Sequence, residues 1–169
     1  MANFLTVKIG NPYKSISNVS AGSAVSTTGI QFLTSVSITG NTFSSGDVIT
    51  IEGMVSKSST LGTLTPYFYW NTTASLSGAI LIGTSSSVAA STRSFIFYRR
   101  INIINVNGTG VGTIGANAST ASTQDVTSVS GDISNLAINW TVNGHIILAS
   151  DHANGGESLT GQWIRVSNF

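Results

Sequence analysis

The feature that most constrains the fold is an alternation of apolar and polar residues in the stretch 136–150. Four large apolar residues share one parity, and small or polar residues lie between them: Leu136, Ile138, Trp140 and Val142. Side chains of a strand alternate between its two faces, so this pattern predicts a strand with one buried face. Asn143-Gly144 has the composition of a type I′ turn, and the apolar run 145–150 predicts a returning strand covered on both sides.

Similar strand signals recur at short, regular spacing from Ile30 onward, and no stretch has helical periodicity. About nine or ten short strands separated by turn residues indicate an all-β protein. We therefore expect an antiparallel β-sandwich of the jelly-roll type over residues 29–169. Residues 1–28 are predicted to form an N-terminal strand and an extended arm, and residues 117–132 a long Ser/Thr/Ala loop.

The composition excludes several functional classes. Charged residues make up 8% of the chain, against about 25% in an ordinary globular domain, and the net charge is +1. There is no basic field beyond Arg99-Arg100, so nucleic acid is not an expected partner. The chain has no cysteine and no apolar run long enough to insert into a membrane, and Met1 to Gly10 does not resemble a signal peptide. A surface of small, uncharged polar side chains causes little charge repulsion between copies, which favours assembly into larger particles.

The run 93–106 has apolar residues on both parities, so its outward face is expected to be covered by a long loop or another subunit. We interpret it as a candidate interface between copies of the chain. The residues assigned to this interface are Phe95, Phe97, Tyr98, Arg99, Arg100, Ile101 and Ile103.

Motifs for catalysis or cofactors are weak. Gly110 to Gly115 matches a dinucleotide fingerprint in letters, but no amphipathic helix follows it. Ser150-Asp151-His152 reads as a polar turn, since adjacent residues of an extended chain point to opposite sides. Asp151, His152 and Glu157 form a weak alternative metal site. We predict no catalytic residue, no metal and no cofactor, hence no enzyme.

Glu52 stands in the middle of a predicted strand. A carboxylate there can be catalytic, but pairing with an arginine is the simpler interpretation. The candidate partners are Arg93, Arg99 and Arg100.

Aromatic residues offer a second kind of site. In the strand 64–70, Tyr67 and Tyr69 share one side, while Phe68 and Trp70 share the other. One pair is expected in the core, and the other can be core, interface or a platform for a sugar. Tyr67, Tyr69 and Trp163 are the candidate glycan platform, which makes a carbohydrate-binding sandwich module the alternative function.

Gly46-Asp-Val-Ile-Thr-Ile-Glu-Gly followed by an aromatic strand resembles the layout of small bacteriophage virion proteins. The end of the chain is similar too, with Leu136-Ala-Ile-Asn-Trp-Thr-Val and Leu159-Thr-Gly-Gln-Trp-Ile-Arg-Val. The resemblance covers roughly residues 30–169. It implies a jelly-roll domain of a fibre, spike or capsid decoration, commonly trimeric, with no shared catalytic residues. The expected partners are further copies of the chain, other capsid or tail proteins and a host surface glycan. The expected location is the virion surface, after synthesis in the host cytoplasm.

Overall fold

The computed structural model describes residues 13–85, 87–113 and 133–168, and these residues form ten strands. The strands are β1 (Ser15–Asn18), β2 (Gly29–Ile38), β3 (Val48–Lys57), β4 (Leu64–Asn71), β5 (Ile80–Thr84), β6 (Ser94–Asn105), β7 (Thr109–Thr113), β8 (Ile133–Leu136), β9 (Gly144–His152) and β10 (Leu159–Asn168).

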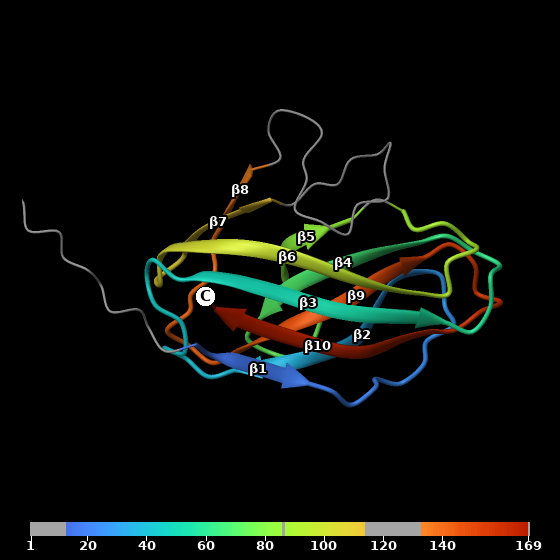
Figure 1. The fold of residues 1–169 in the computed structure, drawn as a ribbon, viewed down its shortest axis with the longest axis horizontal. Helices are drawn as coiled ribbons and strands as arrows, with labels where there is room; N and C mark the ends of the chain where they lie inside the picture. The colour runs from blue at the N-terminus through green and yellow to red at the C-terminus, as the bar shows by residue number, and fades with distance from the viewer. Residues whose placement is uncertain (1–12, 86, 114–132, 169) are drawn as a thin grey trace, which may run out of the picture.

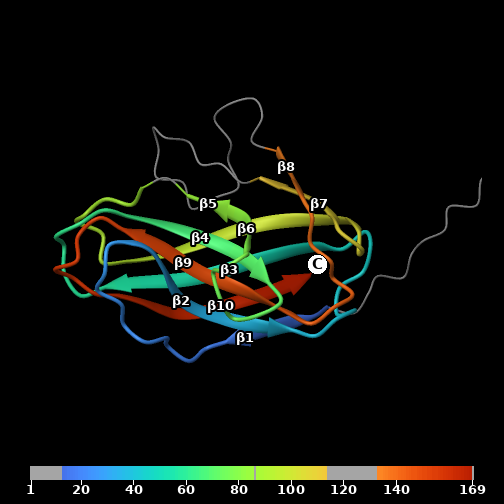
Figure 2. The ribbon, with the colours of Figure 1, turned by 180° about the vertical axis from the view of Figure 1, so that it is seen from behind.

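The strands form two antiparallel sheets that lie face to face (Figures 1 and 2). The six-stranded sheet has the order β1-β10-β3-β6-β7-β8, and the four-stranded sheet has the order β2-β9-β4-β5. The first and last strands of the sandwich are neighbours, and the chain passes repeatedly from one sheet to the other. Apart from the added β7–β8 hairpin, this is the strand order of a jelly roll. The predicted all-β jelly-roll sandwich is confirmed.

The core fills the space between the two inner faces. At its centre, Phe68 of β4 stacks on Phe97 of β6, with ring centroids 4.4 Å apart. At one end, Trp140 packs against Trp70 and against the edge of Phe43, at centroid distances of 4.9 and 5.7 Å. These five rings are buried. Phe68, Trp70 and Phe97 are inward residues of strands, whereas Phe43 and Trp140 lie in connecting segments that cover one end of the core.

The prediction of a hairpin over residues 136–150 is wrong. Leu136 ends β8 in the six-stranded sheet and Gly144 begins β9 in the other sheet, so the intervening residues cross between the sheets. Their hydrogen bonds to other segments are isolated ones, among them the bridge of Asn139 to Asn107, a 2.7 Å bond from the Trp140 amide to the Val106 carbonyl and a 2.8 Å bond from the Asn41 amide to the Trp140 carbonyl. The alternation therefore predicts burial of side chains up to Trp140, but the segment lacks a strand partner.

The predicted type I′ turn is absent as well, because neither Asn143 nor Gly144 has a positive φ. Glycine is required at 144 for a different reason. A Cβ atom there would lie 2.4 Å from the indole carbons of Trp70. The returning strand β9 does match its prediction, since residues 146–150 are buried on both parities.

The N-terminal boundary also differs from the prediction. β1 pairs with β10 along its whole length, from Ser15 opposite Ser167 to Asn18 opposite Ile164. Beyond β1, the amides of Gly22 and Val25 donate to carbonyls of β10. The sandwich thus begins with β1 and not at residue 29. The predicted strand near the N-terminus lies outside the described residues, as does the loop 117–132.

We expect Gly144→Ala to lower the free energy of unfolding by about 2 kcal/mol, because the new methyl group overlaps Trp70. Urea denaturation measures this. Gly29→Ala is the matched control, since it has open space around it but a φ of +84°. It should cost about 1 kcal/mol from the backbone alone. Equal costs for the two variants would contradict the close approach at Gly144.

Candidate functional site

The residues of the candidate interface on β6 belong to both faces of the strand. Phe97, Arg99, Ile101 and Ile103 are buried inside the chain's own sandwich. The prediction is wrong for these four, because one parity of the strand is already covered by the opposite sheet. The Arg99 guanidinium donates to the carbonyls of Tyr98 and Thr84 and lies 4.6 Å above the Phe97 ring.

The other parity of β6 faces outward. Ile96 and Ile104 are 50% and 53% exposed, Arg100 is exposed and Tyr98 is half-buried. Phe95 is partly buried and packs against the core. The outward apolar residues of β6 are thus Ile96 and Ile104, which the sequence prediction did not include.

The three residues of the candidate glycan platform lie on two different sheets. Tyr67 and Tyr69 share the outer face of the four-stranded sheet and stack on each other, with centroids 5.9 Å apart at 29°. Burial, followed by the negative charge of Asp151, raises the pKa of Tyr67 above its usual value of 10. Burial likewise raises the pKa of Tyr69, followed by the effects of Tyr67 and Asp151. Both side chains are half-buried on this face.

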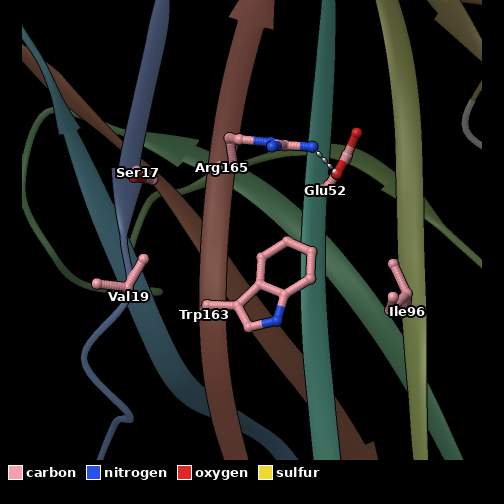
Figure 3. Close-up of a pocket in the computed structure, with 6 residues that line it drawn as sticks. All are labelled: Ser17, Val19, Glu52, Ile96, Trp163 and Arg165. Atoms are coloured by element: carbon pink, nitrogen blue, oxygen red, sulfur yellow. Dashed lines mark hydrogen bonds and ion pairs between the residues drawn. The ribbon is translucent and has the colours of Figure 1, made fainter.

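Trp163 lies on the outer face of the opposite sheet, so it is not part of a site with the two tyrosines. It lines an open hollow of about 450 Å³, here called the Trp163 hollow. The residues around it come from four segments: Ser17, Val19, Glu52, Ile96, Trp163 and Arg165. Figure 3 shows the indole reaching from β10 to the edge of β3, between Val19 and Ile96. Trp163 is the cross-strand neighbour of Met54 on β3, and Met54 is the neighbour of Ile96 on β6. The three side chains therefore form a row on the same outer face.

Glu52 is paired with an arginine, as predicted, but the partner is Arg165. The two residues are direct neighbours on β3 and β10, and Arg165 Nη2 donates to Glu52 Oε2 at 2.7 Å. The side chains are 45% exposed for Arg165 and 26% for Glu52. Arg99 and Arg100 lie on the strand at the other side of β3. The pair stands beside the indole at the rim of the Trp163 hollow (Figure 3).

Glu157 is a buried carboxylate at one end of the sandwich, and the sequence did not predict its burial or its cluster of partners. Glu157 has no exposed side-chain surface and accepts four hydrogen bonds. These come from His152 Nε2 at 3.0 Å, the Ser59 hydroxyl at 2.8 Å, and the amides of Leu61 and Gly62 at 3.1 Å each. An ionised carboxylate only accepts, so His152 Nε2 donates here.

Lys57 completes this buried cluster. Its ammonium lies 3.8 Å from Glu157 Oε1 and donates to the carbonyls of Gly62 and Ala90, at 2.6 and 2.8 Å. Burial raises the pKa of the Glu157 carboxyl, but the hydrogen bond from His152 and the other donors outweigh it, with Lys57 adding to them. The resulting pKa is about 2. Glu157 is thus held as an anion.

Neither a metal site nor a catalytic pair forms from the predicted acids. His152 and Glu157 meet, but Asp151 points to the outer face of the four-stranded sheet, and Lys57 supplies the cation that the carboxylate needs. In residues 13–85, 87–113 and 133–168, no group of three metal-binding side chains converges. Glu52 and Asp151 project from the outer faces of opposite sheets, so they cannot act on one substrate bond.

The glycine fingerprint is part of a hairpin. Gly110 and Gly112 lie in β7 and pair with residues of β6 and β8, so this part of the fingerprint is in a strand. Residues 114 and 115 lie outside the described part of the chain. Within the described ranges, the structure has no helix of the length and apolar character that crossing a bilayer demands.

No protein-family model matches this chain, and no curated protein matches it either. Among solved structures, it is similar to the crystal structure of a glycosyl hydrolase family protein from Mycobacterium fortuitum. The identity is 9%, and the match covers 81% of this chain and 73% of that one, with a TM-score of 0.31. A similarity at this level carries no inference about fold or function.

The Glu157 cluster predicts how stability depends on pH. Because the folded state lowers the pKa of Glu157 from 4.5 to about 2, its stabilisation is complete above pH 4.5 and is lost as the pH falls toward 2. We expect Glu157→Gln to lose roughly 3 kcal/mol at neutral pH, since it leaves Lys57 buried without its counter-charge. The loss should shrink in acid, as measured by urea denaturation at several pH values.

Glu52→Gln is the matched control, because it makes the same chemical change in the exposed pair with Arg165. It should cost less than about 1 kcal/mol. A difference between wild type and Glu157→Gln that stayed constant from pH 7 to the acid limit would show that Glu157 is not held as an anion.

Proposed function

We propose that this chain is a non-enzymatic structural protein of a bacteriophage virion, exposed at the particle surface. It forms a homotrimeric jelly-roll appendage, either a capsid decoration or the head of a fibre or spike that takes part in host attachment. Its partners are further copies of itself and other capsid or tail proteins. The sequence resemblance to small virion proteins supports this proposal, and the jelly-roll strand order is compatible with it.

The observation that carries the assembly part is a set of exposed apolar side chains on the outer face of the six-stranded sheet. Val48 and Ile104 are 39% and 53% exposed, on strands whose inner residues are almost fully buried. Apolar residues projecting from a sheet face are suited to contact with another protein surface. A net charge of +1 leaves little repulsion between copies.

The interface is assigned to the end of the sheet that carries Val48 and Ile104, together with Arg100. Val48 is the cross-strand neighbour of Asn102, so the exposed ends of β3 and β6 lie side by side there. This replaces the buried residues of the interface predicted from sequence by outward residues of the same strand.

A carbohydrate-binding module is the second candidate function. The flat, half-exposed indole of Trp163 beside a charged pair favours it (Figure 3). The two functions are compatible, since a virion surface protein can recognise a host glycan.

Native mass spectrometry tests the assembly. We expect the purified chain at micromolar concentration to have three times the mass of one chain. Ile104→Asp should shift the population toward monomer, because it places a charge in the proposed apolar contact. Leu61→Asp is the matched control, since Leu61 is similarly exposed at 60% but lies in a loop, and it should leave the trimer intact. A wild-type chain that remains monomeric at high concentration would contradict the proposal.

A further inference from the structure

We propose that the Trp163 hollow is a binding site for one ring of a neutral sugar. The inference deepens the proposed role in host attachment and rests on it only for its biological meaning, because the contacts that define the site belong to a single chain. The hollow is open, has a volume of about 450 Å³ and combines one aromatic ring with one ion pair. This combination of an apolar floor and few polar groups is typical of small-ligand sites.

The indole supplies the floor of the site. It is seen face-on from outside the sheet, between β10 and β3, so its broad face is directed away from the protein (Figure 3). The face of an aromatic ring carries partial negative charge, and the C–H groups on one side of a pyranose carry partial positive charge. Val19 and Ile96 stand on either side of the indole, and their apolar side chains bound the area that a sugar ring would cover.

Glu52 and Arg165 supply the polar contacts. Their ion pair uses Oε2 of the carboxylate and Nη2 of the guanidinium. Within the described residues, Oε1 of Glu52 and Nη1 of Arg165 make no hydrogen bond to another side chain, and both are available to sugar hydroxyls. One group accepts and the other donates, which suits neighbouring hydroxyls that can each do both.

The Glu52–Arg165 pair carries one negative and one positive charge, so it favours a neutral sugar over a charged one. A carboxylate-bearing sugar would gain an interaction with Arg165 but would be repelled by Glu52 at the same rim. A neutral hexose can hydrogen-bond to both groups without repulsion.

The site and the proposed interface lie at different places on one sheet. Trp163 is level with Met54 of β3, and Val48 is six residues away along the same strand. At 3.3 Å per residue, that separation is roughly 20 Å. A sugar can therefore reach the indole while Val48 and Ile104 are covered by a second copy.

Titration of the ¹⁵N-labelled chain with methyl glycosides of glucose, galactose and mannose, and with N-acetylglucosamine, tests the site by NMR. The three tryptophan indole N–H signals report separately on Trp70, Trp140 and Trp163, and the first two are buried. We expect saturable shifts of the Trp163 signal with at least one sugar, at millimolar affinity, and constant signals from the buried pair. Methyl glucuronide tests the charge selection and should bind more weakly than the neutral sugars.

Variants separate recognition from folding. Trp163→Ala should abolish saturable binding, whereas Trp163→Tyr keeps a ring and should retain part of it. Glu52→Gln should lower affinity about tenfold through loss of a charge-assisted hydrogen bond. Tyr69→Ala, on the opposite sheet, is the control that should leave affinity unchanged. Binding in the variants is compared only after their circular dichroism matches that of the wild type.

Three results would overturn the proposal: no shift of the Trp163 signal with any neutral sugar, binding of the glucuronide alone, or a Trp163 signal that changes with protein concentration and not with sugar. The last would mean that a second copy covers the hollow. The first two do not depend on the trimer, which native mass spectrometry tests independently. Failure of sugar binding and failure of assembly are therefore distinguishable.

Discussion

The contact between the inner faces of the two sheets is the constraint on which the other features depend. Phe68 and Phe97 stack across the interior at 4.4 Å, and Gly53 of β3 faces them. A Cβ atom at Gly53 would lie 2.9 Å from a methyl group of Leu148 and 3.3 Å from Phe68. Interiors are close-packed, so these contacts determine which parity of β3 is buried. The alternate residues of the same strand, including Glu52, must then face outward.

Strand periodicity in the sequence was sufficient to predict the class of fold. The alternation in β4 and the double apolar pattern of β9 both correspond to burial in the structure, and the parity argument placed Tyr67 with Tyr69. Periodicity reports only whether a side chain is covered. It does not report which segment lies alongside. Leu136 to Trp140 alternates because these residues pack into the end of the core as the chain crosses between sheets. The same pattern would arise in a true hairpin.

The same limit explains why the sequence did not predict which residues meet at the candidate sites. The Glu52–Arg165 pair depends on the register between β3 and β10, and Glu157 meets Ser59 across 98 positions of the chain. No local pattern records such contacts. The double apolar character of β6 was read as an interface, although half of it is ordinary core. The outward half, with Ile96 and Ile104, was distinguishable only once the facing sheet was known.

The two glutamates show how burial determines what a carboxylate can do in this fold. Glu157 is enclosed, receives four hydrogen bonds and has Lys57 nearby, so it stabilises one end of the sandwich and has no capacity left for a ligand. Glu52 has one ionic partner and stays accessible to solvent, next to an indole whose face is turned outward. Buried polar groups must be satisfied internally, whereas a rim group can exchange water for a ligand. We therefore place the proposed recognition site on the outer face of the six-stranded sheet, where Glu52 and Trp163 combine unused polar capacity with apolar area.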